Sequence, residues 1–164
     1  MPAWLTVYVR ESVGSLTPKE ILSELRRADF DTLAEVHEID EALVDDLDDH
    51  LRITGEVLGD AEVHYKPPEF RPITLHHWTE PARVEEELEE AKEGGDLPKK
   101  IATVLGKVRE VVALELGFGM YKDMGIVLAW EIARIVARKG RGVVKDDDGH
   151  WSVLDKGGGY VHLD

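Results

Sequence analysis

Hydrophobic positions alternate with polar ones in several short stretches of the chain, which is the pattern of half-buried β-strands. The first of them, Trp4–Arg10, is rich in β-branched and aromatic residues. Two pairs of later stretches indicate hairpins, because a short connection rich in proline, glycine or aspartate joins each pair. The stretches predicted as strands are 4–10, 62–65, 72–78, 111–116, 142–145, 150–154 and 160–163.

Other stretches repeat their apolar residues at helical spacing. Thr17 is placed as an N-cap, with Pro18 at the first helical position and Glu20 completing a capping box, so a helix is predicted to begin there. Another helix is predicted to begin at Pro81. Residues 120–138 are apolar on nearly every side, which is typical of a helix enclosed by protein, and we expect this helix to be the central element.

A further helix is predicted over Thr32–Leu51, and it carries much of the negative charge. Its apolar residues recur every three or four positions, at Val36, Ile39, Leu43, Leu47 and Leu51. Four acidic residues fall on the opposite side, within a sector of about 100°, since each residue turns a helix by about 100°. These residues are Glu41, Asp45, Asp48 and Asp49. We expect them to form one acidic face, which either keeps this surface solvated and prevents self-association or binds a basic partner.

Strands separated by helices, together with two hairpins, indicate an α+β fold. The length of 164 residues suits one domain, residues 1–164, with a core of its own. We predict a two-layer domain in which a mixed sheet is packed by helices. One concrete arrangement begins with a ferredoxin-like β-α-β-β-α-β unit and adds a helix and a hairpin.

The charge of the chain is strongly negative and unevenly distributed. The formal net charge is -14, and residues 29–62 contain thirteen acidic residues but one basic residue, Arg52. Such a surface repels nucleic acid and attracts basic proteins, so we expect a basic protein partner and no nucleic acid. No apolar run reaches the roughly 20 residues of a membrane helix, and no signal peptide is apparent. The chain has no cysteine, and we expect a cytoplasmic protein without a cofactor.

The histidines suggest one candidate metal site. Glu62 and His64 share a face of a predicted strand, because residues two apart point the same way, and His76 and His77 lie on the next strand. Adjacent His76 and His77 cannot both point toward one ion from a regular strand. A metal site and ordinary strand histidines are therefore both open, with no HExxH helix or cysteine pair to favour the metal.

Two glycine-containing segments are similar to ligand motifs. Asp146–Gly149 clusters carboxylates, but its glycine is fourth, where an EF-hand loop needs it sixth, so a hairpin turn is favoured over a calcium site. Gly117–Gly119 lies between a predicted strand and helix, as a nucleotide-binding turn does. Lys122 stands where the third glycine of G-x-G-x-x-G belongs, so a tight connection is the favoured interpretation.

The C-terminal part of the chain resembles a known family. Val111–Gly117, Asp123–Arg134 and Gly142–Trp151 form a strand, an apolar helix and a hairpin whose acidic turn leads to tryptophan. This arrangement is similar to small bacterial immunity proteins of polymorphic toxin systems and related uncharacterised domains. The resemblance implies a cytoplasmic antitoxin that acts by binding and not by catalysis. It transfers no binding residues.

Three functional hypotheses follow from the sequence. The first is a binding protein that neutralises a basic partner, such as a nuclease-like toxin domain, through the acidic face. The second is a small enzyme or metal-binding protein that uses His64, His76 and His77. The third is an oligomeric interaction module.

Overall fold

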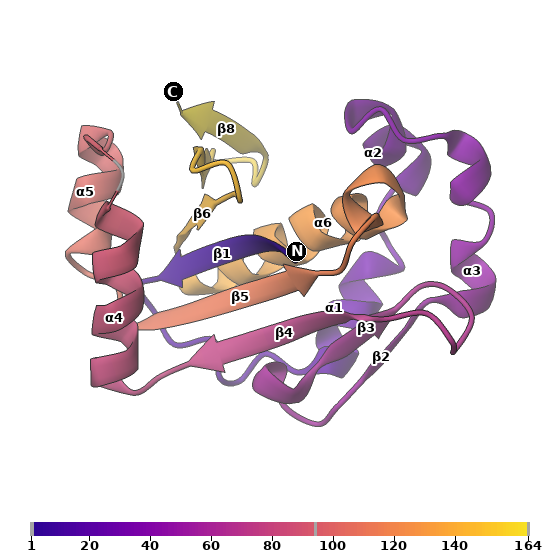
Figure 1. Ribbon diagram of the computed structural model, residues 1–164, viewed down its shortest axis with the longest axis horizontal. Helices are drawn as coiled ribbons and strands as arrows, with labels where there is room; N and C mark the ends of the chain where they lie inside the picture. Colours follow the sequence, from indigo (N-terminus) through magenta and orange to yellow (C-terminus); the bar gives the residue numbers. More distant parts are fainter. Residues whose placement is uncertain (1, 94, 164) are drawn as a thin grey trace.

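The strands form one continuous sheet with helices on both of its faces (Figure 1). The computed structural model describes residues 2–93 and 95–163. The strands are β1 (Ala3–Val9), β2 (Arg52–Thr54), β3 (Glu62–His64), β4 (Ile73–Trp78), β5 (Glu110–Leu116), β6 (Val143–Lys145), β7 (Trp151–Leu154) and β8 (Tyr160–Leu163). The α-helices are α1 (Pro18–Leu25), α2 (Phe30–Val36), α3 (Leu47–His50), α4 (Pro81–Lys92), α5 (Lys99–Leu105) and α6 (Met124–Gly140). The 3₁₀ helices are η1 (Glu41–Leu43), η2 (Leu58–Asp60) and η3 (Met120–Lys122).

The eight-stranded sheet has the order β2-β3-β4-β5-β1-β6-β7-β8, and every neighbouring pair is antiparallel. The predicted α+β class is confirmed. The sheet is antiparallel, whereas a mixed sheet was predicted. Strands β5 and β6 flank β1 and run parallel to each other, since both are antiparallel to β1, and α6 connects them. The four central strands, in the order β4-β5-β1-β6, have the ferredoxin-like arrangement that the sequence suggested, because β1 and β4 run parallel on either side of β5 and β5 and β6 run parallel on either side of β1. Helix α1 lies in the first crossover, which also contains β2 and β3, and α6 lies in the second.

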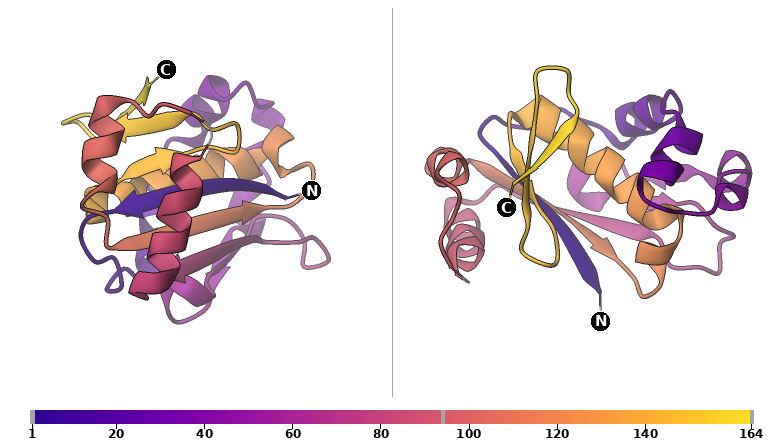
Figure 2. Two further views of the ribbon diagram at one scale, coloured as in Figure 1. Left: turned by 60° about the vertical axis from the view of Figure 1, so that its left-hand side comes forward. Right: turned by 90° about the horizontal axis from the view of Figure 1, so that it is seen from above.

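The larger hydrophobic core lies between the sheet and helices α1, α2 and α6. Leu5, Val7 and Val9 point into this core, as the alternation in β1 predicts. On the opposite face, α4 and α5 pack on a smaller cluster that includes Tyr8 and Trp151 (Figure 2). The expected two layers therefore become three where α4 and α5 cover the sheet.

Helix α6 is the central helix, as predicted, and it begins at Met124 because the preceding residues form η3. The Asp123 carboxylate caps it by accepting a hydrogen bond from the Gly125 amide at 2.7 Å. Near its other end, a Cβ atom on Gly140 would lie 2.5 Å from the Cβ of Val9. Glycine therefore lets α6 approach β1 closely. With 17 residues α6 is the longest helix in the described ranges, and none of the helices there combines the length and apolarity of a membrane span.

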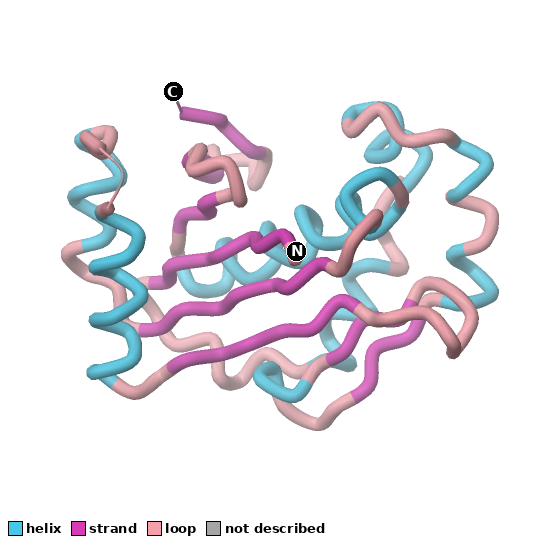
Figure 3. The backbone as a smooth tube through the Cα atoms, in the orientation of Figure 1, coloured by secondary structure: helices cyan, strands magenta, loops and turns pink. Residues whose placement is uncertain are grey.

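The prediction of one helix over Thr32–Leu51 is wrong, because α2, η1 and α3 divide this stretch (Figure 3). Helix α2 ends in a Schellman motif in which Glu38 has a φ of 58° and the Ile39 amide donates to the Ala34 carbonyl at 2.8 Å. Asp40 then caps η1 by accepting a hydrogen bond from the Ala42 amide. The apolar spacing still identified buried positions, since Ile39 is only 8 % exposed.

Charge repulsion supplies the physical reason for the break. In a continuous helix, Glu41, Asp45 and Asp49 would follow one another at intervals of four, and like charges at that spacing destabilise a helix. Aspartate side chains also compete for backbone amides and so favour caps over helix interiors. Three short helical segments relieve the repulsion and still bury Ile39, Leu47 and Leu51, whereas Val36, which was also predicted to face the core, is 69 % exposed.

Candidate functional site

The strongest candidate site is the acidic segment, which we define as residues 29–50. It contains α2, η1 and α3, which lie together at one end of the molecule, away from α4 and α5 (Figures 1 and 2). Its apolar side chains, among them Ala34 and Leu47, are buried in the larger core. The segment is thus held against the body of the protein through its apolar side, and its carboxylates point outward.

The four predicted partner-binding residues lie on three consecutive pieces of this segment. Glu41 is in η1, Asp45 is in the turn that follows, and Asp48 and Asp49 are in α3. All four are exposed, although they do not share one helix as expected. Within residues 2–93 and 95–163, none of the ion pairs includes a carboxylate of the acidic segment.

Other carboxylates of the segment accept hydrogen bonds that cap helical segments. The side chain and amide of Thr32 donate hydrogen bonds to Asp29, and these bonds lower the pKa of the Asp29 carboxyl below its usual value. Asp40 caps η1 in a similar way. Asp29 and Asp40 therefore cap the starts of helical segments. The four predicted partner-binding carboxylates are exposed on the same segment.

An apolar groove adjoins the acidic segment. Its volume is about 590 Å³, and it lies between α2, α6 and β8. Val36 on its rim is 69 % exposed. The Trp130 ring lies edge-on to Tyr160 with centroids 5.0 Å apart, and the Tyr160 hydroxyl donates to the Trp130 carbonyl at 2.6 Å. The His37 ring stacks on the Trp130 ring with centroids 6.4 Å apart. Rigid aromatic side chains of this kind are common anchors in protein interfaces. No pattern in the sequence predicted this groove.

The candidate histidines do not converge. His76 lies between Trp4 and Trp78 on one face of β4, with ring centroids 5.4 and 5.8 Å away, and its Nε2 is 3.1 Å from a Glu115 carboxylate oxygen. His77 points to the opposite face, as the strand alternation predicts. His64 lies in β3, where burial lowers its pKa. In the described part of the chain, no group of three potential ligands includes any of these histidines.

His77 forms part of a partly buried polar contact that joins β4, the first residue of β5 and the loop after β1. Its Nε2 lies 2.7 Å from Glu110, and the Val13 amide donates to the same carboxylate at 3.1 Å. Burial alone raises the pKa of Glu110, but the hydrogen bonds from His77, Val13 and Ser12 more than offset this and leave the pKa lowered. The ionised carboxylate is therefore favoured in the folded protein.

We expect the substitution Glu110→Gln to destabilise the protein by about 1–3 kcal/mol at pH 7. A lowered pKa stabilises the fold above the unfolded pKa of about 4.3, and this contribution is lost as the pH falls through the folded pKa. The difference in free energy of unfolding between the two proteins should therefore shrink as the pH falls below 4.3. Urea unfolding at pH 7 and at about pH 3.5 measures it, with the exposed Glu89→Gln as control. A difference that does not change with pH would contradict this role.

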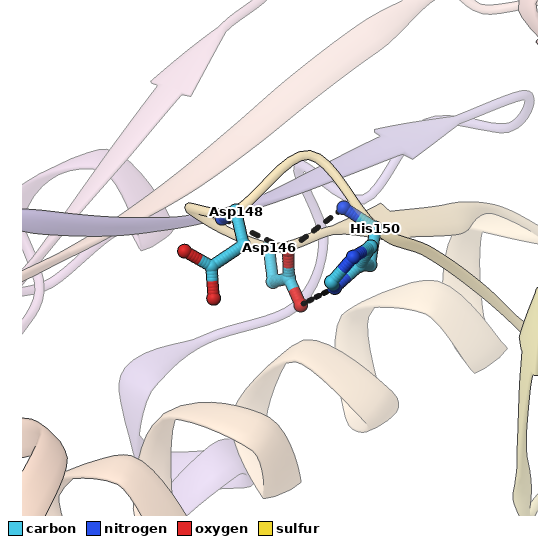
Figure 4. Close-up of side chains that lie close together, drawn as sticks. All are labelled: Asp146, Asp148 and His150. Atoms are coloured by element: carbon cyan, nitrogen blue, oxygen red, sulfur yellow. Dashed lines mark hydrogen bonds and ion pairs between the residues drawn. The ribbon is translucent and has the colours of Figure 1, made fainter. Parts of the chain in front are cut away.

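The acidic turn at 146–149 is a hairpin turn, as predicted (Figure 4). Asp146 Oδ1 accepts hydrogen bonds from the Asp148 and His150 amides at 3.0 and 2.8 Å, and Gly149 has a φ of 86°. Asp146, Asp148 and His150 are close enough together to hold a metal ion. The hydrogen bonds of the turn already account for their proximity.

The prediction of a tight connection at Gly117–Gly119 also agrees with the structure. Gly119 has a φ of 87° and leads into η3. The N-terminus of α6 that follows already holds the carboxylate of Asp123, which also accepts a hydrogen bond from Tyr65 at 2.7 Å and pairs with Lys66 at 2.6 Å. A phosphate at this terminus would meet that negative charge.

Comparison of the chain with known proteins finds no matching family model, no matching curated protein and no matching solved structure. The resemblance of the C-terminal part to immunity proteins therefore stays a prediction.

Proposed function

We propose that this protein binds and neutralises a basic partner protein through the acidic segment, as a cytoplasmic immunity protein does with a nuclease-like toxin domain. The observation that carries the proposal is the set of exposed carboxylates at one end of the molecule that form no ion pair with any cation among residues 2–93 and 95–163. Glu41, Asp45, Asp48 and Asp49 are the residues we assign to the partner.

The chemistry of the segment fits a partner with a positively charged cleft. A nuclease needs such a cleft to hold phosphates, and a fixed carboxylate surface is complementary to it. The attraction raises the rate of encounter, and the folded segment can then occlude the cleft. Carboxylates give little net affinity at an exposed rim, so the adjoining apolar groove between α2 and β8 supplies the buried contact that a stable complex needs.

The experiment uses the protein as bait in an extract of the cells that produce it, at low ionic strength. Each retained protein is identified and purified, and its affinity is measured by calorimetry between about 50 and 300 mM salt. We expect a basic partner whose activity is inhibited on binding and whose affinity falls by on the order of tenfold across this range, because salt screens exposed charges. A neutral or acidic partner, or an affinity that salt does not change, would contradict the proposal.

A further inference from the structure

A groove at the C-terminal end of α6 gathers positive charge in a protein that is otherwise strongly acidic. Its volume is about 460 Å³. The basic residues that line it are Arg10, Lys100, Arg138, Arg141 and Lys156. Asp155 is the single acidic residue among the described residues of its lining. The whole chain has 34 acidic residues against 20 lysines and arginines, so this groove reverses the charge balance of the protein.

The basic side chains come from separate elements. Arg10 follows β1, Lys100 is in α5, Arg138 is in the last turn of α6, and Lys156 lies between β7 and β8. Cations near a helix C-terminus complement the helix dipole, which accounts for Arg138. The dipole does not account for Lys100 or Lys156, because other segments bring them to the groove. Strand and helix packing in the smaller core holds these segments together.

The turn after α6 fixes the Arg10 guanidinium against the backbone of Arg141. Arg141 has a left-handed backbone with a φ of 53°, at a position where helices usually have glycine. Its carbonyl oxygen accepts a hydrogen bond from Arg10 Nε at 2.7 Å. A Cβ on the next residue, Gly142, would lie 2.4 Å from the Tyr8 carbonyl oxygen, so this turn packs tightly against β1. The Arg141 side chain pairs with Glu11 only at 3.7 Å, and both side chains are exposed.

The acidic residue of the groove is engaged elsewhere. Oδ1 of Asp155 accepts hydrogen bonds from the Gly157 and Gly159 amides, each at 2.9 Å, and so shapes the turn between β7 and β8. The floor of the groove includes the buried side chains of Val143 and Val153. The groove thus combines a cluster of cations with an apolar floor.

We propose that this groove binds a small organic phosphate of about the size of a mononucleotide. Guanidinium groups hold phosphate oxygens by paired, charge-assisted hydrogen bonds, and the ammonium groups of Lys100 and Lys156 add positive charge. The apolar floor suits a ring or hydrocarbon portion attached to the phosphate, and the volume lies within the usual range for small-molecule sites. This proposal does not rest on the function proposed above, because the cations of the groove lie outside the acidic segment, although Gly157 and Gly158 also line the apolar groove.

Calorimetry and amide chemical shifts test the site with three probes: adenosine 5′-monophosphate, inorganic phosphate and adenosine. We expect both phosphates to bind and to shift the amides of Gly142, Gly157 and Gly158, with adenosine at least about tenfold weaker than its monophosphate. Adenosine that binds as well as its monophosphate, or phosphates that do not bind at about 10 mM, would overturn the proposal.

A charge-matched pair of variants separates the site from the net charge. The triple variant Lys100→Gln, Arg138→Gln and Lys156→Gln removes three cations from the groove. The control Lys19→Gln, Lys122→Gln and Lys139→Gln removes three exposed cations that do not line it. We expect the first variant to lose at least about tenfold in affinity for adenosine 5′-monophosphate and the control less than about threefold. Equal losses in the two would overturn the proposal, and thermal unfolding checks that both remain folded.

Discussion

Replacing Ile132 by alanine is expected to lower the free energy of unfolding by about 2–5 kcal/mol. Ile132 is 0 % exposed and lies in α6, on the side that packs in the larger core. The substitution removes buried methyl and methylene groups and leaves a cavity, because the sheet and the neighbouring helices relax only partly around it. Urea unfolding at pH 7 measures the effect as a lower midpoint with an unchanged slope.

The matched control is Val36→Ala on α2. Val36 is also an aliphatic side chain on a helix, but it is 69 % exposed, so its truncation should change the free energy of unfolding by no more than about 0.5 kcal/mol. Equal effects at the two positions, or a loss at Ile132 below about 1 kcal/mol, would mean that α6 is not the centre of the core.

Local sequence signals predicted the ends of elements well. Thr17 caps α1 as predicted, since its Oγ1 accepts the Glu20 amide hydrogen bond at 3.2 Å. The Glu20 carboxylate accepts from the Thr17 hydroxyl at 3.1 Å, where a full capping box would have it accept from the Thr17 amide. Helix α4 begins at Pro81 as predicted. Both hairpins form at the expected positions. These features depend on residues close together in the chain, and such interactions are visible in the sequence.

The spacing of apolar residues predicted which residues are buried more reliably than it predicted one continuous helix. The apolar spacing from residue 36 to 51 predicted five core-facing residues, of which Ile39, Leu47 and Leu51 are buried, Leu43 is half-buried and Val36 is exposed. It did not show that Glu38 would adopt a left-handed backbone or that Asp40 would begin a new helical segment. A stripe of the same spacing is produced by one long helix or by short helical segments laid along the same core. The charges between the apolar residues decide between the two, through repulsion and capping.

The sequence patterns did not predict which distant segments of the chain lie side by side. The order of the strands places β6, β7 and β8 on one side of β1, and Lys156 and Arg10 line the same groove. No spacing along the chain links residues that are more than a hundred positions apart. The apolar groove also joins separate parts of the chain, because Tyr160 of the last strand contacts Trp130 of α6. The acidic segment was found from the sequence because its charges are contiguous.

Reversing the four assigned carboxylates to lysine is expected to slow association with the basic partner by about 10- to 1000-fold at low salt. Glu41→Lys, Asp45→Lys, Asp48→Lys and Asp49→Lys together shift the net charge by +8 and leave the buried residues of the segment unchanged. Long-range attraction acts on the encounter, so the dissociation rate should change much less than the association rate. Stopped-flow or surface plasmon resonance measurements with the purified partner, at about 50 and 300 mM salt, separate the two rates.

The control reverses four exposed carboxylates in and next to α4, at the other end of the molecule, and so changes the net charge equally. These substitutions are Glu85→Lys, Glu89→Lys, Glu90→Lys and Glu93→Lys. If the local field of the acidic segment steers the partner, this control should lose no more than about threefold in association rate, because its charges lie farther from the interface than a screening length of about 8 Å at physiological salt. Equal slowing in both variants would instead assign the attraction to net charge, and the acidic segment would then be a solubilising surface that the partner does not contact.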